Sequence, residues 1–117
     1  MSAQPTERPL SNWDREAIGE LAVSALVDYL PLPVGAMTPR ADAVHITVVS
    51  SRELALWVWE LGGRIDKGPS SGGVTLWTLY TETPERGTKG APVLIRVHVA
   101  VVDGEDVLAE VRPGAGR

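Results

Sequence analysis

The stretch at 44–63 (VHITVVSSRELALWVWELGG) constrains the fold of this chain more than any other, because several local signals agree there. Its first part alternates between an aliphatic face, made by Val44, Ile46 and Val48, and a second face that begins at His45. This period-two pattern is typical of a strand with one buried face. The stretch therefore begins with a predicted strand.

A helix is predicted to follow this strand at once. Ser50 and Glu53 have the spacing of a capping box, in which each side chain accepts a hydrogen bond from the backbone amide of the other. The residues at helical spacing on one side are apolar: Leu54, Trp57, Val58 and Leu61. Gly62 can adopt the left-handed conformation that ends a helix. We expect a short helix with one buried side.

A second helix is predicted before this unit. Ser11 and Asp14 have a weaker capping-box spacing, and prolines at 31 and 33 end the helix. Apolar residues recur every three or four positions after Trp13: Ile18, Leu21, Ala22, Ala25, Leu26 and Tyr29. We expect this stripe to lie on a sheet, with the acidic residues mostly outward.

The rest of the chain predicts strands at 63–67, 74–81 and 93–102, with an edge strand at 106–111. Residues 31–43 are expected to be a linker, and 68–73 a flexible turn. The element order α-β-α-β-β-β-(β) predicts an α+β two-layer sandwich. Its mostly antiparallel sheet of four or five strands should carry both helices on one face. We expect one domain at 11–111, with flexible tails at 1–10 and 112–117.

Composition limits the class of protein. The chain has 117 residues, no cysteine and a net charge of −4, which suits one domain without a disulfide framework. No apolar run approaches the about 20 residues that span a bilayer, and no signal peptide is evident, so we expect a cytoplasmic protein. Abundant Gly, Ala, Arg and Pro, with no Phe, indicate a bacterial or phage gene from a high-GC genome.

One candidate ligand site lies on the predicted strands. His45, Arg96 and His98 each fall on the side opposite a clean aliphatic face. If the two strands are neighbours, these side chains share one surface, and two close imidazoles could do acid–base work or bind a metal. Ordinary solvated side chains explain the same pattern, and these strands carry no carboxylate.

A candidate partner surface comes from apolar residues outside the predicted inner faces. Leu56 and Trp59 lie on the outer side of the 51–61 helix, and Trp77 and Leu94 belong to the strands. Tryptophan is enriched among residues that dominate protein binding. Alternatively, the N-terminal helix packs over Trp59.

The string HIT, ELA and WVWELGG, followed by three strands, resembles one βαβββ module of the vicinal oxygen chelate superfamily. That resemblance implies a divalent-metal site, in which His45 would match the ligand on the first strand. The family also uses a glutamate near the last strand, where this chain has His98, and its sites need two modules.

These patterns favour a non-enzymatic protein-interaction or regulatory module without a cofactor. The expected partner is a second copy, giving a homodimer, or another protein. The alternative is a small-molecule or metal-binding module. The charges are interspersed and form no basic stripe, which disfavours nucleic acid as a partner.

Overall fold

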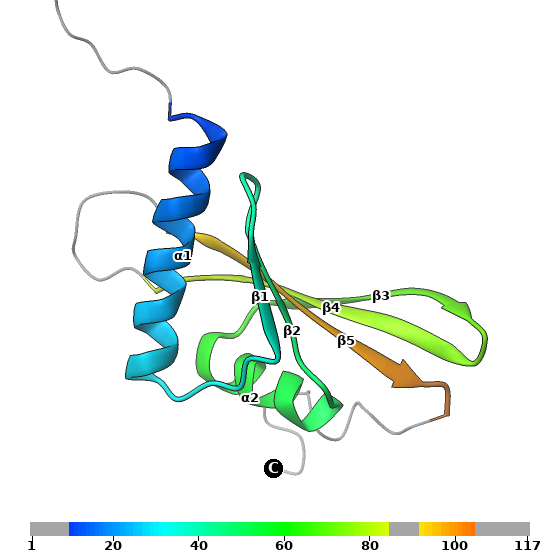
Figure 1. Ribbon diagram of the computed structural model, residues 1–117. Coiled ribbons are helices and arrows are strands. Elements are labelled where there is room, and N and C mark those ends of the chain that lie inside the picture. Colours follow the sequence, from blue (N-terminus) through cyan, green and yellow to red (C-terminus); the bar gives the residue numbers. More distant parts are fainter. Residues whose placement is uncertain (1–9, 85–91, 105–117) are drawn as a thin grey trace, which may run out of the picture.

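The computed structural model describes residues 10–84 and 92–104, and within them confirms the predicted α+β class (Figure 1). Two helices pack on one face of a five-stranded mixed sheet. The elements follow the chain as α1 (Asn12–Tyr29), β1 (Ala36–Pro39), β2 (Val44–Thr47), α2 (Ser51–Leu61), β3 (Arg64–Ser71), β4 (Val74–Glu82) and β5 (Leu94–Val102).

The sheet has the strand order β1-β2-β5-β4-β3. β2 and β5 are parallel, whereas every other neighbouring pair is antiparallel. The last long strand therefore inserts between the strand–helix unit and the β3–β4 hairpin. The segment β2-α2-β3-β4-β5 follows the βαβββ order that the resemblance implied.

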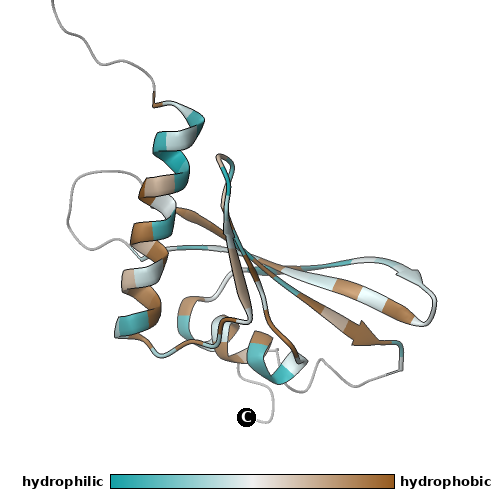
Figure 2. Cartoon of the chain, viewed as in Figure 1, coloured by the Kyte–Doolittle hydropathy of each residue, from teal (hydrophilic) through white to brown (hydrophobic). Residues whose placement is uncertain are grey.

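The core lies between the helices and the inner side of the three central strands. β5 is hydrophobic along most of its length (Figure 2), and every second residue is buried there: Ile95, Val97, Val99 and Val101. Trp57 of α2 is completely buried, and its indole N–H donates to the Pro33 carbonyl at 2.8 Å. Trp57 thus fills the core and also holds the segment that connects α1 to β1.

Helix α2 buries the side predicted for it, with Leu54, Trp57 and Val58 in the core. The Ser50 hydroxyl accepts from the Glu53 amide at 3.2 Å, as the capping pattern predicts. The return half differs, because the Glu53 carboxylate accepts from the amide of Val49 at 3.1 Å.

Helix α1 begins as predicted, since Ser11 and Asp14 form a reciprocal capping box. The predicted inner side is confirmed only in part. Leu26 is buried as predicted, but Gly19 and Val23 are the other buried residues, and Leu21 is 73% exposed. Ile18 and Tyr29 are also exposed, at 48% and 69%.

Gly19 explains why this side of α1 meets the sheet. A Cβ atom at Gly19 would lie 2.8 Å from a methyl group of Val44 on β2, so the helix backbone approaches the strand closely there. A glycine permits this contact, whereas the larger residues of the predicted stripe would hold the helix away. Close packing therefore favours the side of α1 that carries Gly19.

Three predictions about the strands need correction or lie outside the structure. The expected linker at 31–43 contains the edge strand β1, and β3 continues to Ser71, which confines the turn to Gly72 and Gly73. Both glycines have positive φ, at 63° and 81°. The predicted strand at 106–111 and nearly all of both predicted tails lie outside the described residues.

Candidate functional site

The candidate site lies on the open face of the sheet, opposite the helices. The parallel pairing of β2 with β5 sets His45 beside Arg96 and Thr47 beside His98. On the other side of β5, Thr78 of β4 is the cross-strand partner of His98. The pairing therefore unites two histidines that are 53 positions apart in the sequence.

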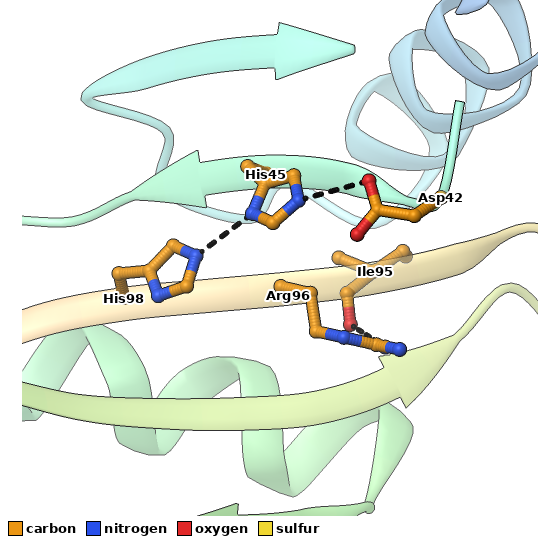
Figure 3. Close-up of polar contacts among 5 residues, drawn as sticks. All are labelled: Asp42, His45, Ile95, Arg96 and His98. Carbon is orange, nitrogen blue, oxygen red and sulfur yellow. Dashed lines mark hydrogen bonds and ion pairs between the residues drawn. The ribbon is translucent and has the colours of Figure 1, made fainter. Parts of the chain in front are cut away.

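Four side chains form a chain of polar contacts across this face. His45 Nε2 lies 3.4 Å from an Asp42 carboxylate oxygen, and His45 Nδ1 lies 3.0 Å from His98 Nε2 (Figure 3). His98 Nδ1 lies 2.9 Å from the Thr78 hydroxyl. All four imidazole nitrogens thus have partners.

The two imidazoles meet edge to edge. Their planes are 6° from parallel and their centroids are 5.2 Å apart. With the facing nitrogens at hydrogen-bonding distance, this separation suits two nearly coplanar rings joined nitrogen to nitrogen, and it is too long for a contact between ring faces. One hydrogen therefore lies between the rings.

The chemistry of the four groups fixes where the protons sit when both histidines are neutral. An ionised Asp42 only accepts hydrogen bonds, so His45 Nε2 donates to it. His45 Nδ1 then accepts from His98 Nε2, and His98 Nδ1 accepts from the hydroxyl of Thr78. This assignment follows from the hydrogen-bond network.

Burial lowers the pKa of His98 below its ordinary value, and repulsion from a proton on His45 and from the charge of Arg96 lowers it further. For Asp42, burial acts to raise the pKa. The hydrogen bond to His45 and its charge outweigh this effect and leave the Asp42 pKa below its ordinary value. The neutral His98 and the ionised Asp42 agree with the assigned chain of donors.

Beside the histidine pair, Tyr80 lies between two arginines from the flanking strands. The guanidinium carbons of Arg64 and Arg96 each lie 4.5 Å from the centroid of its ring. Arg64 also pairs with Asp66 at 2.8 Å. Arg96 donates to the Ile95 carbonyl at 3.2 Å, and no carboxylate within the described ranges pairs with it.

The metal site implied by the resemblance does not fit this geometry. His45 Nδ1 and His98 Nε2 point at each other through a hydrogen bond, and Asp42 contacts the opposite nitrogen of His45. These atoms do not converge on one point, as ligands of a metal must. Residues 10–84 and 92–104 contain no group of three side chains suited to hold a metal.

The structure separates the four predicted partner-binding residues. Trp59, Leu56 and Leu94 are 66%, 48% and 41% exposed, so α1 does not cover Trp59. Trp77 is 8% exposed and belongs to the core, and the amine of the exposed Lys67 lies 5.3 Å from its ring centroid. Burial removes Trp77 from any contact surface.

Sequence reasoning missed Asp42, Thr78 and Tyr80, which complete the polar face. Tyr80 and Thr78 share a side of the predicted strand at 74–81, so their period-two spacing already signalled a common face. The alignment of β4 with β5, which the spacing does not contain, brings Thr78 to His98.

No family model, curated protein or solved structure matches this chain. Neither helix in the described part of the chain is long and apolar enough to cross a membrane.

Proposed function

We propose that this protein works by binding another protein, with the outer side of α1 as the main contact surface. The observation that carries the proposal is the exposure of Trp13 and Leu21, at 75% and 73%. They belong to a stripe on the side of α1 opposite the core, here called the α1 stripe: Trp13, Ala17, Ile18, Leu21 and Ala25. All five are exposed.

An uncovered apolar helix side supports a role in binding. Soluble monomers rarely expose large contiguous apolar patches, and burial of such a surface favours association. Tryptophan is prominent among the residues that dominate binding energy. Trp59 and Leu56 on α2 form a smaller exposed surface and are the second candidate contact.

The edges of the sheet are poor contact surfaces by comparison. β1 has four residues and ends in Pro39. β3 contains Pro69, and its pairing with β4 is irregular between Lys67 and Ser70. Short strands, prolines and irregular pairing oppose the addition of another strand. Helix sides are therefore the better candidates for the contact.

The charge of α1 favours a different protein over a second copy. The helix carries four acidic residues and one basic residue: Asp14, Glu16, Glu20, Asp28 and Arg15. Asp14 and Asp28 flank the two ends of the α1 stripe. Two such helices in contact would bring like charges together, which disfavours association. A partner with an apolar strip between basic residues fits better than a homodimer.

Two matched double variants test the contact. W13S/L21S removes a tryptophan and a leucine from α1, and W59S/L56S removes the same residue types from α2. We expect the first variant to lose a partner that wild type captures from its own cell extract, and the second to keep it. If both variants still capture the partner, the proposal is contradicted.

Sedimentation over a wide concentration range identifies the partner as a copy or as another protein. We expect wild type to sediment as a 12.5 kDa monomer. If wild type is a dimer and W13S/L21S is a monomer, the α1 stripe is still the contact surface, but the partner is a second copy and not another protein.

The open face of the sheet supports a second candidate function, the binding of a small molecule. One observation favours it: within the described residues, Arg96 has no acidic partner although it lies beside the histidine pair.

A further inference from the structure

Two arginines contact the same tyrosine ring, but only one of them is paired with a carboxylate in the described residues. Arg64 and Arg96 lie equally close to Tyr80, but Asp66 neutralises Arg64. Arg96 is half-buried and keeps an uncompensated charge within the described part of the chain. Stacking on the ring holds its planar guanidinium in place, and that group is suited to bind a carboxylate through two parallel hydrogen bonds.

The histidine pair can accept one proton without losing a hydrogen bond. If His45 becomes charged, its Nδ1 donates to His98 Nε2, and His98 Nδ1 donates to the Thr78 hydroxyl. The whole chain of bonds reverses and stays complete. A second proton would place two N–H groups face to face at the 3.0 Å contact and break it.

The charges that face the pair leave a place for one negative charge. Asp42 offsets a proton on the pair, and Arg96 then remains positive. The open face of β3 and β4 presents Arg64, Asp66, Tyr80 and Glu82; Arg64 and Asp66 neutralise each other, and Glu82 lies opposite Leu94 at the end of β4. β1 has no charged residue, but Arg40 follows it in the turn that contains Asp42. Glu82 and Arg40 carry opposite charges, so together they leave the net charge of the face unchanged. A monoanion is therefore the best match for the protonated face.

We propose that Arg96 and the His45–His98 pair form a carboxylate-binding site, and that the pair takes up one proton when the carboxylate binds. The proposal rests on the second candidate function and is independent of the α1 stripe. Arg96 supplies the planar pair of donors. The proton on the histidines adds to the attraction of Arg96, which solvent and salt partly screen.

The experiment follows imidazole NMR resonances during titration with sodium acetate, against sodium chloride at equal ionic strength. We expect acetate to raise the midpoint of the shared titration of His45 and His98. By linkage, acetate should also bind roughly fivefold or more tightly at about pH 6 than at about pH 8. No difference between acetate and chloride would overturn the proposal.

Arg64 provides the matched control. R64Q should keep the acetate response and R96Q should lose it, while R96K, which keeps the charge but not the planar fork, should weaken it. Equal loss in R64Q and R96Q would show general screening and overturn the site. A response to phosphate without one to acetate would overturn the assignment to a carboxylate.

H45N/H98N tests the proton. Neither asparagine side chain has a titrating nitrogen, so acetate should bind this double variant with the same affinity at both pH values. Persistent pH dependence would contradict the role of the pair. The carboxylate site and the protein contact are tested separately. W13S/L21S changes only α1, whereas R96Q and the histidine variants change only the open face of the sheet.

Discussion

Helices α1 and α2 start from the same kind of sequence and reach different outcomes. Each begins at a serine whose hydroxyl accepts from the amide three residues on, and each carries apolar residues on more than one side. α2 buries the side that its periodicity predicts, whereas α1 is rotated away from its predicted side, so that Gly19 and Val23 are buried beside Leu26 and Leu21 is exposed.

The connections of the two helices account for the difference. α2 follows β2 almost directly and is closed by Gly62, so short links to two strands of the same sheet fix its rotation. α1 has only one described link to the sheet, through the segment that leads to the edge strand β1. Periodicity identifies an apolar side, but close packing at Gly19 decides which side of α1 the sheet covers.

The largest expected effect contrasts two tryptophans. W57A should lower the free energy of unfolding by about 3–5 kcal/mol, because it opens a cavity and removes the hydrogen bond to Pro33. W13A should change it by no more than about 0.5 kcal/mol, because Trp13 is exposed. Urea unfolding of both variants measures the contrast, and similar losses would show that the α1 stripe packs within the monomer.

G19A tests which side of α1 meets the sheet. Alanine favours a helix over glycine by about 1 kcal/mol, but its Cβ would lie 2.8 Å from Val44. Overpacking costs about 1–3 kcal/mol, so we expect a small net loss of stability. Thermal unfolding beside A17G, which weakens the helix on its exposed side, checks this result. A more stable G19A would mean that the contact with Val44 is loose.

The two caps should respond alike, despite the different fates of their helices. S11A and S50A each remove the hydroxyl that accepts from the third residue of the helix. Loss of such a cap costs about 1 kcal/mol. Equal losses in urea unfolding would show that helix initiation is local, whereas a much larger loss in S50A would show that α2 begins only where tertiary contacts hold it.

The smallest expected effect is the change of the free energy of unfolding with pH. Neither helix carries a histidine, so the difference between W57A and W13A should not depend on pH. The folded state lowers the His98 pKa below the 6.5 of the unfolded chain. The unfolded chain therefore binds more protons near and below that value, and stability should fall as pH decreases through it. Urea unfolding of wild type and H98N at several pH values measures this; an equal pH dependence in H98N would exclude His98 as its source.

Local patterns predicted α1, α2, β2, the first part of β3, β4 and β5 because alternation, helical spacing and caps act between residues a few positions apart. They missed β1, since Pro39 and the flanking prolines made the segment resemble a linker. They placed His45, Arg96 and His98 on open strand faces, but only adjacency of β2 and β5 makes them one site. No feature of either strand alone specifies that neighbour.

The sequence by itself determined which residues begin and end the helices, and which sides of the strands are apolar. The tertiary structure decided that α1 turns the side with Gly19 to β2, that Trp77 is buried, and that His45 is hydrogen-bonded to His98. The physical reason is that backbone conformation and capping are local, while rotation of a helix and strand order depend on the packing of distant segments.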